Sequence, residues 1–130
     1  MKNISKLIVS IASVLIGMLL MPMMLFAAEG MLTGTGTESD PYIINTVNDF
    51  GIIQDGIKSG KSYKNKYFRL ESDIKLPTDW KPLGMLKEGV TDAGNGRNIL
   101  PFSGILDGNG HTLTFSKGSK PLFGYVRDAQ

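Results

Sequence analysis

The chain has 130 residues, no cysteine, one histidine and a formal net charge of +2 at pH 7. Without cysteine it forms no disulfide, and one histidine alone cannot build an ordinary zinc site, so we expect neither a metal nor a cofactor. Lys2 and Lys6 lie in the first 28 residues, which leaves residues 29–130 with 12 basic side chains (14 minus 2) against 12 acidic ones. This neutral balance gives no support for the basic face that binding to nucleic acid requires, so we expect no nucleic-acid partner.

The first 28 residues have the pattern of a secretory signal peptide. Lys2 and Lys6 precede an apolar run from Leu7 to Phe26, and the small residues Ala27 and Ala28 follow it. The run is about 20 residues long, enough to cross a bilayer, so an uncleaved signal anchor is the alternative. We therefore expect a secreted or cell-surface (extracytoplasmic) protein that meets the membrane only through this signal segment.

Residues 29–41 are small, polar and rich in glycine, which predicts a flexible lead-in. The β-prone residues 42–44 come next and predict a first strand. Thr46 and Asp49 have the spacing of a helix-opening capping box, so we expect a helix over residues 47–59. Its predicted apolar face consists of Phe50, Ile53 and Ile57.

From residue 67 the apolar period changes from helical to alternating. Residues 67–76 predict a strand whose inward face carries Phe68, Leu70, Ile74 and Leu76. Residues 79–84 predict a compact turn, and residues 85–100, which lack a sustained period, predict a surface loop. Further short strands are expected at 102–106, 112–115 and 121–126.

Several segments in a fixed order resemble the opening of bacterial surface proteins with a GLUG-type right-handed parallel β-helix domain. The segments are GTGTESDPYII, YFRLESDIKL, DWKPLG, PFSGILDGNGHTLTF and PLFGYV. The resemblance implies a mainly β fold, the start of a right-handed parallel β-helix (solenoid) with a short N-terminal capping helix. Residues 42–130 would then be the cap and the first rungs, truncated at the C-terminus.

The resemblance implies a non-catalytic structural or adhesive role for this β-helix fragment, so we expect no enzyme activity. Partners would be a host or cell-wall glycan or a protein surface. Because each coil of a solenoid needs a neighbour to cover its apolar end, we also expect self-association through the open C-terminal rung, near Leu122, Phe123 and Tyr125.

The segment from Asp107 to His111 is the strongest candidate for a chemical site, because Asp, Asn and His gather there. It begins like a calcium loop, but His111 stands where a third oxygen ligand is needed and Thr112 where glycine is required. We therefore predict a structural turn made by Asp107, Gly108, Asn109, Gly110 and His111, with no catalytic or metal role.

Two functional alternatives remain. Asp73, Asp79, Asp92 and Asp107 could belong to the acidic groove of a carbohydrate-active β-helix enzyme, a lyase or hydrolase, although the interpretation as solvated turn carboxylates is favoured. A carbohydrate-binding module would instead use aromatic side chains, and the candidate glycan contacts are Tyr63, Tyr67 and Trp80. For Trp80, packing in the core or at its rim is the favoured interpretation.

Overall fold

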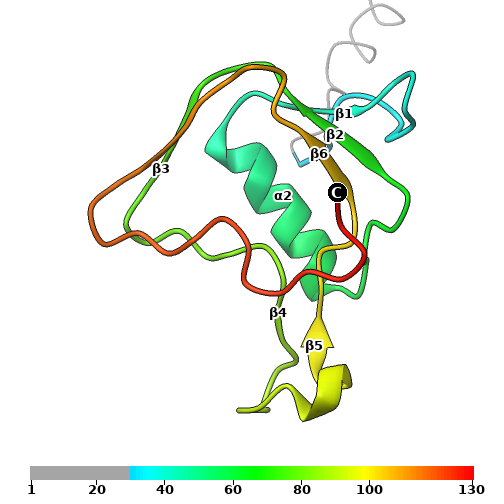
Figure 1. Cartoon of the computed structure of the whole chain (residues 1–130), viewed down its shortest axis with the longest axis vertical. Helices are drawn as coiled ribbons and strands as arrows, with labels where there is room; N and C mark the ends of the chain where they lie inside the picture. The colour runs from blue at the N-terminus through cyan, green and yellow to red at the C-terminus, as the bar shows by residue number, and fades with distance from the viewer. Residues whose placement is uncertain (1–29) are drawn as a thin grey trace, which may run out of the picture. The chain divides into compact units, whose positions relative to one another are not determined.

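The computed structural model describes residues 30–130, and Leu32–Gln130 form one compact unit within them (Figure 1). The predicted signal peptide lies outside the described residues. The unit consists mainly of short strands in open sheets, with one α-helix, so the predicted mainly β class is confirmed. No helix among residues 30–130 is long and apolar enough to cross a membrane.

The largest sheet in this unit stacks three short strands in parallel. Its order is β1 (Tyr42–Ile44), β2 (Tyr67–Leu70) and β6 (Ile105–Asp107). The register places Phe68 of β2 beside Leu106 of β6, and Phe68 is buried in the core. Since side chains alternate along a strand, the neighbours of Phe68 in β2 point to the outer face of the sheet.

A second parallel pair shows that the chain repeats its path. Strand β3 (Ile74–Leu76) pairs with β7 (Leu113–Phe115), so β2 and β3 form a first coil and β6 and β7 a second coil beside it. Isolated parallel bridges join Leu83 to Phe123 and Phe102 to Val126 and continue the same stacking. In Figure 1 the two coils follow nearly the same outline.

Helix α2 (Val47–Lys58) lies across one end of the coils, inside their outline in Figure 1. Its capping box is present, and the carboxylate of Asp49 accepts the backbone N–H of Thr46 at 2.9 Å. The predicted helix is confirmed to within one residue. The predicted apolar face, Phe50, Ile53 and Ile57, is buried in the core.

The segment predicted as a surface loop contains regular structure. Strand β4 (Met85–Leu86) pairs antiparallel with β5 (Ile99–Leu100), and a short 3₁₀ turn, η1 (Gly94–Gly96), lies between them. Two-residue strands are too short to produce a periodic signal, which is why the sequence predicted a loop. We call residues 84–101 the hairpin insert; Figure 1 shows it projecting away from the coils.

The hairpin insert is an addition to the first coil. Eighteen residues lie between Leu83 and Phe102, whereas only two lie between their bridge partners Phe123 and Val126. The first coil therefore has 16 more residues here than the second (18 minus 2), and both coils still meet in register on either side of the insert.

Three strand predictions need correction. The predicted strand 102–106 is a single bridge at Phe102 followed by β6, which begins only at Ile105. The predicted strand 67–76 is divided by a bend at residues 71–73, where Ser72 interrupts the apolar alternation and the chain turns from β2 into β3. The predicted strand 121–126 makes only the two isolated bridges, because each of its ends meets a different part of the first coil.

The predicted flexible lead-in has defined structure over residues 33–40. Thr33 forms an antiparallel bridge with Ile43, and the backbone N–H groups of Thr35 and Gly36 both donate to the carbonyl of Asp40, at 3.1 and 3.0 Å. The glycines permit this tight turn, because Gly36 has a φ of +73°. Residue composition alone indicated flexibility and could not show these bonds.

Candidate functional site

The corner from Asp107 to His111 joins β6 to β7 and ties the second coil to the first. Asn109 adopts the left-handed conformation, with a φ of 47°, and its backbone N–H donates to Asp107 Oδ1 at 2.8 Å. The Asn109 side-chain amide donates to the carbonyl oxygen of Leu70 in β2 at 3.1 Å. Asparagine tolerates this backbone region better than most residues, so one residue supplies the turn through its backbone and the link between coils through its side chain.

The histidine of this corner lies beside the bend of the first coil. His111 Nδ1 is 3.3 Å from Asp73 Oδ1, and the same oxygen accepts the backbone N–H of Thr112 at 2.8 Å. The Thr112 N–H, followed by the His111 contact, lowers the pKa of the Asp73 carboxyl. The side chains of Asp73, Asp107 and Asn109 each bond a backbone group at this corner, which is the geometry of a structural turn.

Two of the four carboxylates considered as an acidic groove, Asp73 and Asp107, lie at this corner, and the other two lie elsewhere in the unit. Asp73 is at the corner, Asp79 follows β3, Asp92 accepts the Gly94 N–H inside the hairpin insert, and Asp107 ends β6. In the part of the chain that the structure describes, no three His, Cys, Asp or Glu side chains are grouped closely enough to hold a metal ion. These carboxylates do not converge on one shared groove.

Tyr63 and Trp80, two of the three candidate glycan contacts, pack against the core. The Tyr63 ring meets Phe68 edge-on with centroids 5.4 Å apart, and burial raises the pKa of its hydroxyl. Trp80 is 5% exposed, meets Phe50 of α2 edge-on at 5.8 Å, and donates its indole N–H to the carbonyl of Pro121 at 3.2 Å. Trp80 therefore joins the helix to both coils, and this packing leaves little of its ring exposed.

Tyr67 has a different setting, on the outer face of the sheet formed by β1, β2 and β6. It lines a hollow of about 200 Å³ together with Arg69, Glu38 and Asp107. Arg69 Nε lies 3.2 Å from Asp107 Oδ2 in a partly exposed ion pair. The Asn109 N–H and then Arg69 lower the pKa of the Asp107 carboxyl. Of the three candidate glycan contacts, Tyr67 is the one that the structure places in this hollow.

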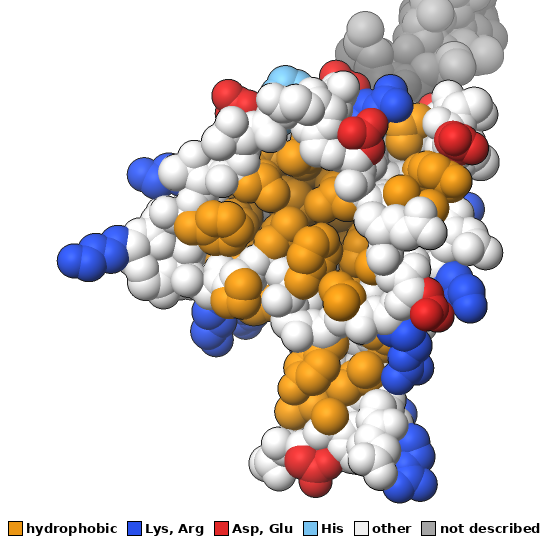
Figure 2. Space-filling model, viewed as in Figure 1, with side chains coloured by type: hydrophobic (Ala, Val, Ile, Leu, Met, Phe, Trp, Pro, Cys, Tyr) orange, Lys and Arg blue, Asp and Glu red, His pale blue; other side chains and the backbone are white. Residues whose placement is uncertain are grey.

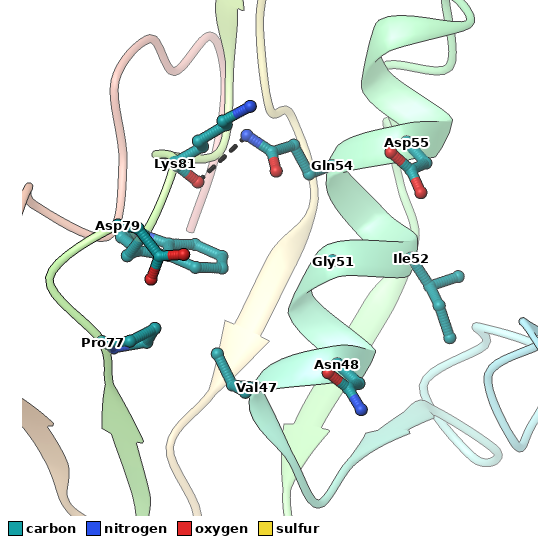
Figure 3. Close-up of a pocket in the computed structure, with 10 residues that line it drawn as sticks. Val47, Asn48, Gly51, Ile52, Gln54, Asp55, Pro77, Asp79 and Lys81 are labelled. Atoms are coloured by element: carbon teal, nitrogen blue, oxygen red, sulfur yellow. Dashed lines mark hydrogen bonds between the residues drawn. The ribbon is translucent and has the colours of Figure 1, made fainter.

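A larger and shallower hollow of about 370 Å³ lies between α2 and the turn at residues 77–81 (Figure 3). Figure 3 shows Gln54 reaching from the helix to the Lys81 carbonyl, a hydrogen bond of 3.0 Å. Gly51 opens this hollow, since a Cβ there would meet no atom within 4 Å. Sequence reasoning missed this feature, although a glycine in mid-helix was a signal for it.

The second coil leaves much of its apolar side uncovered. Figure 2 shows a broad area of apolar side chains on the face that it views. Phe115 and Val126 are 48% and 52% exposed, whereas their register partners in the first coil, Leu76 and Phe102, are 0% and 1% exposed. The same positions that form the core of the first coil are thus open in the second.

The backbone at the same end continues the sheet beyond β6. The N–H of Leu106 donates to the carbonyl of Gln130 at 2.9 Å, and the N–H of Gln130 donates to the carbonyl of Gly104 at 3.3 Å. Gln130 therefore occupies the position of the next parallel strand after β6.

Comparison with known proteins gives one partial similarity. Halomucin from Haloquadratum walsbyi is 36% identical to the chain over an alignment of 89 residues, and the match covers 65% of this chain. The chain spans about 1% of the length of that protein. No family model matches the chain, and no solved structure matches it.

Proposed function

We propose that the chain is the N-terminal capping part of a right-handed parallel β-helix like those of GLUG-type bacterial surface proteins. Its role is structural and non-catalytic: it starts a secreted or cell-surface scaffold used for adhesion or display. The contrast in burial between register partners supports this proposal, since Leu76 is covered and Phe115 is half exposed. A coil that is apolar on an open side gains stability when another coil stacks on it.

The two ends of the unit support different roles. Helix α2 closes one end, and its buried residue Phe50 contacts Trp80 in the first coil. The other end presents the exposed side chains of Phe115 and Val126 and the free edge of β7, which favour addition of a further coil. One end thus stops the stack while the opposite end extends it.

The extracytoplasmic placement is supported by the signal-peptide pattern of residues 1–28. The partial similarity to halomucin is in keeping with this placement.

Measurement of association through the open end tests the proposal. The full-length chain, produced in a secreting bacterial host, should bind a hydrophobic dye and self-associate as concentration rises in sedimentation velocity runs. Phe115→Lys should reduce both effects, because it places a charge among the exposed apolar side chains. Thr114→Lys is the matched control, since Thr114 is its exposed neighbour in β7 and points outward.

A chain that stays monomeric, binds no dye and responds equally to Phe115→Lys and Thr114→Lys would contradict the proposal. Circular dichroism of each variant confirms that strand content is retained, so that loss of association is not mistaken for loss of the fold.

A further inference from the structure

The hollow around Tyr67 is built from register partners on two neighbouring strands. Tyr67 of β2 lies beside Ile105 of β6, and Arg69 lies beside Asp107 one step along the outer face. The first pair gives the hollow an aromatic and aliphatic surface, and the second pair gives it a cation and an anion. Glu38 from the lead-in is a further carboxylate on its lining.

The lead-in side of the hollow is fixed by hydrogen bonds. The carbonyl of Asp40 accepts the backbone N–H groups of Thr35 and Gly36, and the Asp40 carboxylate accepts the Thr35 N–H at 3.0 Å. The Tyr67 N–H donates to the carbonyl of Gly36 at 3.1 Å, which joins this turn to β2. The lining is therefore held in place before any ligand arrives, which lowers the entropy cost of binding.

The chemistry of the lining matches a neutral sugar. The Tyr67 ring and Ile105 offer apolar surface to the C–H face of a pyranose. Arg69 meets Asp107 through Nε, and its guanidinium carries further N–H donors, while the carboxylates accept hydrogen bonds from hydroxyl groups. Arg69 with Glu38 and Asp107 gives a net charge of −1, which disfavours an anionic sugar.

The size of the hollow limits what it holds. At about 200 Å³ it is smaller than the roughly 300–1,000 Å³ typical of sites that enclose a drug-sized ligand. One sugar ring matches this space better than a longer ligand, whose other residues would extend over the surrounding surface.

We propose that this hollow is a binding subsite for one residue of a neutral saccharide, with Tyr67 stacking on the ring and Arg69, Asp107 and Glu38 bonding its hydroxyl groups. The site lies on the outer face of the sheet, away from the inward side chains that stack coil on coil. Its binding is therefore separable from the structural role proposed above.

The test is a titration of the full-length chain with three neutral trisaccharides, maltotriose, cellotriose and N,N′,N″-triacetylchitotriose, and with the anionic trimer of galacturonic acid. Calorimetry or NMR line positions report binding. We expect at least one neutral trimer to bind more tightly than the anionic one. Tyr67→Ala should weaken that binding at least tenfold, whereas Tyr67→Phe, which keeps the ring, should change it by less than about threefold.

Lys75→Ala is the control variant, because Lys75 is exposed on β3 and lies outside the hollow. Its binding should equal that of the wild type. The proposal is overturned by failure of every neutral trimer to bind, by a preference for the anionic trimer, or by equal binding of Tyr67→Ala and the wild type. Dye binding and sedimentation of the same samples report the structural role independently, so failure of one proposal is distinguishable from failure of the other.

Discussion

Phe50 gives the most direct measure of how much the capping helix contributes to stability. Its side chain is 0% exposed and meets Trp80 edge-on with ring centroids 5.8 Å apart. Removing a buried phenylalanine side chain costs about 3–5 kcal/mol, and an aromatic pair of this geometry contributes about 0.5–1.5 kcal/mol beyond area burial. We expect Phe50→Ala to lose about 3–5 kcal/mol in free energy of unfolding, the pair being part of that loss.

The size of this effect requires a milder variant as well. A domain of this size is stable by about 5–15 kcal/mol, so Phe50→Ala comes close to unfolding the protein. Phe50→Leu keeps most of the apolar volume and should lose about 1–2 kcal/mol. Asn48→Ala is the matched control on the same helix, because Asn48 is exposed and its replacement removes no core contact.

Urea unfolding of the full-length chain measures all three variants. Trp80 is the one tryptophan of the chain and is buried, so its fluorescence reports the core while circular dichroism reports the backbone. The reasoning is refuted if Phe50→Ala loses less than about 1 kcal/mol, or if Asn48→Ala loses as much as Phe50→Leu. Either result would mean that α2 is not needed to close the coils.

Other positions give independent tests. Leu70→Asp should prevent folding, because it places a charge at a side chain that is 1% exposed; retained strand content by circular dichroism would contradict the inward assignment. Gly84→Ala should lose about 1–2 kcal/mol in urea unfolding, since Gly84 has a φ of +80° and its missing Cβ would collide with the backbone of the second coil. Gly51→Ala should instead gain up to about 1 kcal/mol, because its Cβ meets open space in a helix; equal effects of the two alanines would refute both arguments. The Thr112 N–H lowers the pKa of Asp73, so the ionised carboxylate stabilises the fold above the ordinary carboxyl pKa of 3.8 and loses this contribution as the pH falls. The difference in melting temperature between the wild type and Asp73→Asn should therefore shrink below that pH. A difference that does not vary with pH would contradict the stabilising role of the ionised Asp73 carboxylate.

Elements with a local signal were predictable from the sequence. The spacing of Thr46 and Asp49 located the start of α2, and the recurrence of apolar residues in the helix identified its buried face. The alternation in residues 67–76 gave the correct inward side chains of β2 and β3. Capping and periodicity depend on residues that are close in the sequence, so they can be recognised without knowledge of the rest of the fold.

Features that depend on contacts between coils were not predictable in the same way. The bend at residues 71–73 is held by bonds to distant segments, such as the Thr112 N–H of the second coil donating to the Asp73 carboxylate. The hydrogen bond from Trp80 to Pro121 spans 41 residues and has no counterpart in local spacing. Such pairings are set by stacking, which a pass along the chain does not reveal.

The residues of the candidate site also differ in whether local sequence could predict them. The sequence indicated Tyr67 as a candidate glycan contact, and its position in an alternating strand was correct. The lining from Glu38 was missed, because composition predicted a flexible lead-in where hydrogen bonds hold a compact turn. The sequence offered two interpretations of Trp80, a glycan contact and a packed side chain, and favoured the second. The burial of Trp80 agrees with a packed side chain.

The hairpin insert shows where this architecture tolerates changes of length. The second coil passes the same place with 16 fewer residues and keeps its bridges on both sides, at Phe123 and Val126. The second coil therefore shows how the first coil could be built without the hairpin insert. The insert begins and ends at neighbouring points of the first coil, so a longer inserted segment is also tolerated. Doubling the length of a flexible loop costs only about 0.6 kcal/mol. The stretch between Leu83 and Phe102 is therefore a place for grafting a foreign peptide or a small domain.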